Sequence, residues 1–159
     1  MGLIYPKIEL INAEDIALLA RKHIIGEEEI KRIRVNALDD TGANTLCINE
    51  TVQKQLDLPL LEMRKGVNAN GEVREYRVVE PIELKFKNRR NLCHAMVLSG
   101  DNEILLGAIP LEDMYVLIDS MKQELIVNPE HPYYVQMSFK HIRKPKTIKN
   151  RYAQFLKRS

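Results

Sequence analysis

The sequence has 159 residues, of which 45% are hydrophobic and 29% charged, and its formal net charge of +2 is ordinary for one soluble globular domain. No apolar run reaches the roughly 18 residues that a membrane-spanning helix needs, and the N-terminus lacks the basic start and apolar stretch of a signal peptide. We therefore expect a cytoplasmic protein in which the two cysteines, Cys47 and Cys93, are reduced thiols.

The charges are unevenly distributed along the chain. Residues 140–159 contain eight Lys or Arg and no Asp or Glu, so the remaining 16 basic and 22 acidic residues give residues 1–139 a formal charge of −6. An acidic body followed by a basic tail indicates two regions with different roles. We expect a folded domain over residues 1–137 and a basic tail over 138–159, suited to contact with an acidic surface, a membrane or a nucleic acid.

The first third of the chain favours short strands and short helices. Residues 3–10 alternate loosely and favour a strand, and residues 12–22 favour a helix capped by Asn12. Residues 30–38 alternate between apolar and polar with period two, which is typical of a half-buried strand. Residues 50–56 favour a second helix, with Asn49 as its cap.

The clearest local signal is a hairpin around Asn70-Gly71. The pair separates two strand-like segments, 62–68 and 72–79, and an Asn-Gly pair favours the two-residue type I′ turn. Many short strands with few helices predict an all-β fold, either a small barrel or a sandwich. The remaining predicted elements are strands at 82–86, 91–98, 104–107, 116–118 and 124–127 and a helix at 111–114.

Asp40-Thr41-Gly42 is the tripeptide with the clearest chemical potential. It ends a strand that is apolar on one face, so the Asp40 carboxylate is presented at the edge of the core. Burial of an unpaired charge there would cost several kcal/mol, which makes Asp a poor core residue. The alternative is an ordinary turn, because Asp and Gly both favour turns. The local sequence leaves both interpretations open.

Residues 37–43, Ala-Leu-Asp-Asp-Thr-Gly-Ala, resemble the active-site strand and loop of retropepsin-like, retroviral-type aspartic proteases. Leu105-Leu106-Gly107 resembles the second signature of that family, and the hairpin between them lies where the family carries its flap. Residues 125–132 resemble the ending of a bacterial and archaeal group of single-domain proteases. The resemblance covers roughly residues 1–137 and implies an all-β fold, a small closed barrel of the retropepsin type with one or two short helices.

The resemblance also implies a function, that of an aspartic endopeptidase in which two carboxyls share one proton and activate a water. The chain carries one Asp-Thr-Gly, so a homodimer is implied in which each copy supplies Asp40. Thr41 is implied to bond across the two-fold axis, and Gly42 to allow close backbone approach. Ala69, Asn70 and Gly71 would contact a peptide or protein substrate. No metal or organic cofactor is implied.

Two positions near Asp40 depart from expected patterns. Ala43 stands where pepsin-like enzymes carry a serine whose hydroxyl favours the ionised carboxylate, so we expect a pH optimum above that of pepsin. Asp39 stands where the retropepsin-like family has an apolar residue. Strand alternation turns it to the face opposite Asp40, where it either meets a basic partner or weakens the core.

Two other functions therefore remain open. One is a catalytically inactive retropepsin-like module that binds peptides or proteins, with Asp39 as a sign of lost activity. The other is a thiol hydrolase that uses Cys93, next to His94 in the sequence. Adjacent residues on a strand face opposite ways, which disfavours a Cys93-His94 pair.

Overall fold

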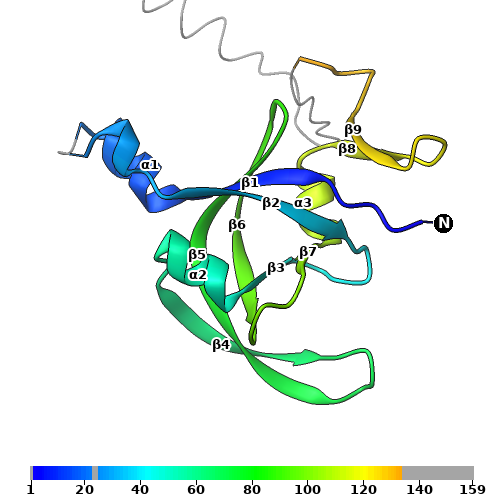
Figure 1. Ribbon diagram of the computed structural model, residues 1–159, viewed down its shortest axis with the longest axis horizontal. Coiled ribbons are helices and arrows are strands. Elements are labelled where there is room, and N and C mark those ends of the chain that lie inside the picture. Colours follow the sequence, from blue (N-terminus) through cyan, green and yellow to red (C-terminus); the bar gives the residue numbers. More distant parts are fainter. Residues whose placement is uncertain (1, 23–24, 134–159) are drawn as a thin grey trace, which may run out of the picture.

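The computed structural model describes residues 2–22 and 25–133 (Figure 1). The basic tail expected at 138–159 lies outside the described residues, as do residues 134–137 of the expected domain. The strands of the described part are β1 (Lys7–Asn12), β2 (Arg32–Asp39), β3 (Leu46–Asn49), β4 (Leu60–Val67), β5 (Val73–Phe86), β6 (Arg89–Leu98), β7 (Ile104–Leu106), β8 (Val116–Asp119) and β9 (Glu124–Val127). Its helices are α1 (Ala13–Ala20), α2 (Glu50–Leu56), α3 (Ala108–Asp113) and a single 3-10 turn, η1 (Glu27–Glu29). The all-β class predicted from the sequence is confirmed.

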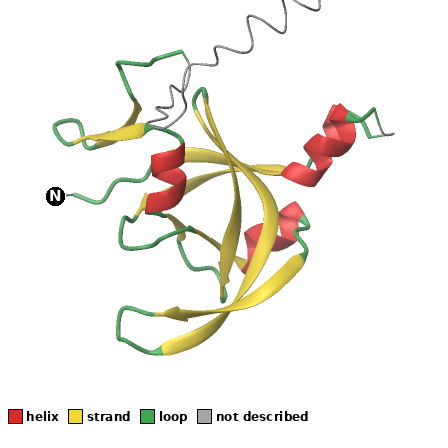
Figure 2. Cartoon of the chain, turned by 180° about the vertical axis from the view of Figure 1, so that it is seen from behind, coloured by secondary structure: helices red, strands yellow, loops and turns green. Residues whose placement is uncertain are grey.

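Most of the strands belong to one sheet that closes on itself. The strand order is β1-β2-β7-β3-β6-β5-β4, and β1 pairs with both β2 and β5, so the six strands other than β4 form a closed barrel. β2 runs parallel to β7, and β3 runs parallel to β6. β4 pairs with β5 alone, and the two strands extend beyond the barrel as a long hairpin (Figures 1 and 2). β8 and β9 form a separate antiparallel pair.

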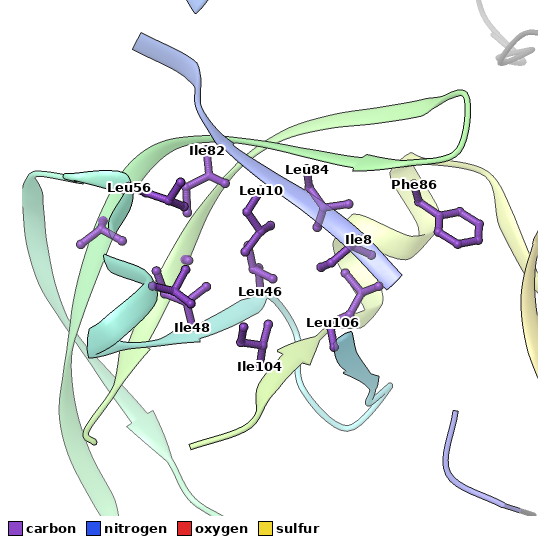
Figure 3. Packing of buried hydrophobic residues seen from close by; sticks show 14 of the residues in the cluster. Ile8, Leu10, Leu46, Ile48, Leu56, Ile82, Leu84, Phe86, Ile104 and Leu106 are labelled. Carbon is purple, nitrogen blue, oxygen red and sulfur yellow. The ribbon is translucent and has the colours of Figure 1, made fainter. Parts of the chain in front are cut away.

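The barrel interior is filled by hydrophobic side chains, most of them aliphatic, from all six strands and from α2 (Figure 3). Alternate residues of each strand point inward, as expected for a closed sheet. Full burial of one such side chain stabilises the fold by about 1.5–3 kcal/mol. The labelled members of this core are Ile8, Leu10, Leu46, Ile48, Leu56, Ile82, Leu84, Phe86, Ile104 and Leu106.

Two asparagines cap the first two helices, as the sequence predicted. The Asn12 carboxamide oxygen accepts from the N–H groups of Glu14 and Asp15 at the start of α1, and Asn49 accepts from the N–H of Val52 in α2. The Asn12 amide also donates to the Leu56 carbonyl at 2.9 Å, which ties the end of β1 to the end of α2. No described helix has the length and apolar character needed to cross a membrane.

The strand expected at residues 3–10 begins later, at Lys7. The preceding residues nevertheless run alongside β2. The carbonyl of Pro6 accepts from the Ala37 N–H at 3.0 Å, and the carbonyl of Ile4 accepts from the Asp39 N–H at 2.9 Å. The N-terminal segment therefore supports the end of β2 that leads into Asp40.

Three further elements differ from the sequence-based expectation. β3 has no predicted counterpart because it is four residues long and follows a turn-rich loop directly. The two strands expected at 72–79 and 82–86 form one strand, β5, because its ladder with β6 continues past Pro81 through a register shift between Val79 and Ile82. The helix expected at 111–114 begins earlier, at Ala108.

Candidate active site

Asp40 follows directly after β2, and backbone hydrogen bonds hold its loop. Its N–H donates to the Leu106 carbonyl at 3.1 Å, and its own carbonyl accepts from the Ala43 N–H at 3.0 Å. Its carboxylate Oδ1 accepts from the Gly42 N–H at 2.9 Å. The other oxygen, Oδ2, makes no hydrogen bond with any described residue. The loop thus fixes one carboxylate oxygen and leaves the other available to a water or a second carboxyl.

The second signature, Leu105-Leu106-Gly107, packs against the loop that carries Asp40. Gly107 precedes α3 and lies against Thr45 so closely that a Cβ there would be 2.3 Å from the Thr45 carbonyl oxygen. The next N–H group, that of Ala108, donates to the Ala43 carbonyl at 2.9 Å. Leu106 is fully buried in the core. The two signatures, which are far apart in the sequence, therefore form one unit, in which Gly107 allows contact between two backbones.

The hairpin predicted around Asn70-Gly71 is present, but its turn type differs from the prediction. The Asn68 N–H donates to the Glu72 carbonyl at 3.0 Å, which leaves a three-residue loop at 69–71. Gly71 has a φ of 82° whereas Asn70 does not have a positive φ, so the turn is not type I′. The Asn68 carboxamide oxygen accepts from the N–H groups of Asn70 and Glu72 and stabilises the wider loop.

A cleft of about 710 Å³ lies between the Asp40 loop and the β4–β5 hairpin. Asp40, Gly42 and Ala43 line it from the loop, and Ala69 lines it from the hairpin. Thr41 is exposed and does not line this cleft. Nor do Asn70 and Gly71, the other two residues expected at the hairpin tip.

The floor of the cleft is apolar. Cys47 of β3 is in register with Leu105 of β7 on one side and with Met96 of β6 on the other, so the three side chains form a row across three strands. Leu98, two residues after Met96, lines the same cleft. Cys47 could not be identified as a floor residue from the sequence because β3 was not predicted. The alternation in β6 between half-buried Met96 and Leu98 and buried Ala95 and Val97 is the signal that could have located the floor.

Asp39 lies on the core side of β2 and shares that face with Ala37 and with Leu106, its register partner in β7. Both carboxylate oxygens are buried, and neither has a hydrogen-bond partner among the described residues. Burial, and then the charge of Asp40, raise the pKa of the Asp39 carboxyl above its ordinary value. The basic partner considered for Asp39 is thus not found in the described part of the chain.

The two cysteines are free thiols in unreactive environments. Burial raises the pKa of Cys93 to about 12, with a smaller contribution from the charge of Asp113. Burial likewise raises the pKa of Cys47 to about 11, with a smaller contribution from Asp40. A nucleophilic cysteine needs a lowered pKa, so both environments disfavour the thiol hydrolase.

Comparisons with known proteins agree with this geometry. Residues 27–113 match the family described as "gag-polyprotein putative aspartyl protease". Among solved structures, 148 chains match. One of them is the retroviral protease-like domain of Ddi1 from Leishmania major, with a TM-score of 0.52 and 13% identity, over 81% of this chain and 90% of that chain. At that identity the likeness shows the fold alone, and it confirms the retropepsin-type barrel. No curated protein sequence matches this chain.

Proposed function

We propose that this chain, which belongs to the retropepsin-like family of gag-type aspartyl proteases, is an aspartic endopeptidase that acts as a homodimer. The observation that carries the proposal is the Asp40 carboxylate, which is fixed through Oδ1 by Gly42 at 2.9 Å and lines a cleft covered by a long hairpin. Such a hairpin is suited to close over a peptide and exclude water.

A single carboxyl supplies half of the chemistry that peptide hydrolysis requires. One carboxylate must accept a proton from the attacking water while a second, neutral carboxyl donates its proton to the peptide carbonyl oxygen. Two carboxylates about 3 Å apart cannot both ionise, so they share one proton. The carboxyl that took the proton of the water then protonates the leaving nitrogen, while the other carboxylate takes a proton from a hydroxyl of the tetrahedral intermediate, and the carbon–nitrogen bond breaks. In this proposal Asp40 and its symmetry mate exchange these two roles.

The apolar surface of the described chain supports a second copy as the partner. Leu117 and Ile118 of β8 are 46% and 42% exposed, and Met121 at the β8–β9 turn is 94% exposed. The β8–β9 sheet has two strands and pairs with no other described strand, so its edges are open to a partner. Gly2 lies beside Gln123 of the same turn. The N-terminal segment thus connects this sheet to the end of β2 and Asp40.

A second candidate function is a retropepsin-like module that binds peptides without cleaving them. The buried carboxyl of Asp39, which has no described partner, favours this binding function. A further acidic group beside Asp40 disturbs the sharing of one proton between the two Asp40 carboxyls. Both candidates predict that the cleft binds peptides, and only the first predicts hydrolysis.

Cleavage of a diverse mixture of synthetic peptides by the wild-type protein and by Asp40→Asn tests the proposal. We expect the wild type to hydrolyse a subset of the peptides and Asp40→Asn to hydrolyse none. Asp57→Asn is a matched control, because Asp57 is exposed at the C-cap of α2 with a φ of 50°, which Asn also tolerates. Hydrolysis that survives in Asp40→Asn would overturn the proposal, and peptide binding without hydrolysis by the wild type would favour the binding module.

Mixing the two proteins tests the shared site. If one Asp40 from each copy is required, a wild-type subunit paired with an Asp40→Asn subunit is inactive. At a constant total concentration, activity after subunit exchange should then fall as the square of the wild-type fraction. A linear decrease would show that each chain is active by itself.

A further inference from the structure

The β4 strand of the hairpin carries a cationic side chain on the face that looks into the cleft. Arg64 is in register with Tyr76 of β5, and directly paired residues share a face. Gly66, two residues further along β4, shares that face too, and a Cβ on it would lie 2.9 Å from Tyr76 Cε2 and 3.3 Å from Met96 Cε. Because Met96 belongs to the cleft floor, the Arg64 face of the hairpin is the inner face.

The Arg64 guanidinium is held in place but retains donors for a ligand. Its Nε donates to Glu62 Oε1 at 2.5 Å, and its Nη1 lies 3.2 Å from His94 Nε2. A guanidinium has donors alone, so His94 accepts through Nε2 and carries its proton on Nδ1. Nη2 makes no hydrogen bond with any described residue. Arg64 is thus oriented by two neighbours while one end of its planar fork stays open to an acceptor.

Arg64 is the basic residue whose side chain faces the cleft. Apart from Asp40, the charged residues that line the cleft are Arg64 and Lys65, and the side chain of Lys65 points to the opposite face of β4 because adjacent strand residues alternate. Arg64 is about half exposed, so a bound peptide would remove it from water and strengthen its attraction to an acidic group. The apolar row of Leu105, Cys47 and Met96 lines the same cleft.

We infer that Arg64 selects peptides with an Asp or Glu side chain at one fixed position, next to a segment whose apolar side chain occupies the floor. The inference rests on the proposed function, because it names the substrate class of the same cleft. It makes Arg64 a specificity-determining residue that contacts the substrate away from the bond that breaks. The contact involves charge, so the preference should weaken as salt is added.

Profiling of cleavage sites tests the inference with wild type, Arg64→Glu and Lys54→Glu. In the wild type we expect Asp or Glu to be preferred over Asn or Gln at one position by about fivefold, the upper range for an exposed ion pair. Arg64→Glu should lose this preference or replace it with one for Lys or Arg, with the apolar preference unchanged. Lys54→Glu makes the same charge change on the exposed side of α2, outside the cleft lining, and should keep the wild-type profile.

A binding measurement separates failure of this inference from failure of the proposed function. Fluorescent peptides in pairs that differ by one Glu→Gln change are titrated into wild type and Arg64→Glu. We expect the Glu peptide of a responsive pair to bind the wild type about fivefold more tightly than its Gln partner, and Arg64→Glu to remove the difference. If the protein cleaves none of the peptides but shows this difference in binding, the inference about Arg64 holds and the proposed protease function is wrong. Cleavage or binding with no acidic preference, or with one that persists in Arg64→Glu, overturns the inference alone.

Discussion

Gly107 packs against the backbone of Thr45, and a Cβ on Gly107 would lie 2.3 Å from the Thr45 carbonyl oxygen and 2.6 Å from its nitrogen. Neither atom can move away without displacing the Asp40 loop. Gly107→Ala should therefore destabilise the protein by about 1–3 kcal/mol, the usual range for overpacking, and reduce any peptide cleavage. The free energy of unfolding in denaturant measures the first effect.

Gly66→Ala is the matched control for this glycine. Its added Cβ would meet the rim of the Tyr76 ring at 2.9 Å and the Met96 methyl at 3.3 Å, both of which are side-chain atoms that can move. We expect a smaller loss of stability than in Gly107→Ala. Equal losses of stability in the two variants would mean that crowding the Thr45 backbone at Gly107 costs no more than crowding the side chains at Gly66.

Asp39 predicts an unusual dependence of stability on pH. In the unfolded chain Asp39 loses its proton around its ordinary pKa of 3.8. In the folded chain the pKa of Asp39 is raised, so the carboxyl keeps its proton to a higher pH. The contribution of Asp39 to stability therefore falls as pH rises from about 3.8 to the folded-state pKa and stays low above it. Asp39→Leu should remove this dependence and stabilise the protein at neutral pH by about 1–3 kcal/mol, the cost of an unsatisfied buried polar group.

Asp39→Asn separates the charge from the polarity of this side chain. It removes the titrating group but leaves a buried amide without a described partner, so it should flatten the pH dependence and recover part of the stability gained by Asp39→Leu. Unfolding in denaturant at several pH values measures both quantities. A wild-type protein whose stability rises steadily from pH 4 to 7, with no change in Asp39→Leu, would contradict this account.

The sequence located those parts of the site that depend on local chemistry. The Asp40 turn follows from a period-two strand running into turn-forming residues, and both helix caps, Asn12 and Asn49, were identified from residue type alone. The closed barrel was implied by the resemblance to retropepsin-like proteases, which the two signatures and the hairpin between them carry. No local pattern shows that Gly107 touches Thr45, because the two residues lie 62 positions apart along the chain.

The sequence could not identify features that depend on tertiary packing. The cleft floor requires Cys47 and Met96 to be in register, and this pairing joins a four-residue strand to a distant one. The turn type of the hairpin depended on the side chain of Asn68, which outweighed the preference of Asn70-Gly71 for a tighter turn. Propensity for a turn is a local preference, and the hydrogen bonds of a neighbouring side chain can override it.

The β8–β9 hairpin leads to a prediction about assembly. Leu117→Arg places a charge on its half-exposed apolar strand, which should leave the isolated fold intact and weaken self-association by about tenfold or more, or about 1.4 kcal/mol. Sedimentation over a range of concentrations measures this change. Leu92→Arg makes the same substitution at a leucine of β6 that is 71% exposed and should leave association unchanged. Equal effects of the two variants would indicate that β8 has no part in the interface.

The cysteines provide a prediction about chemical modification. With pKa values of about 11 for Cys47 and about 12 for Cys93, roughly one Cys47 thiol in ten thousand, and fewer Cys93 thiols, would be ionised at pH 7. Iodoacetamide should therefore modify the folded protein far more slowly than the unfolded chain, in which both thiols titrate near ordinary values. Mass spectrometry follows the modification over time. Cys93→Ala should leave peptide cleavage unchanged, whereas a thiol hydrolase that uses Cys93 would lose its activity in this variant.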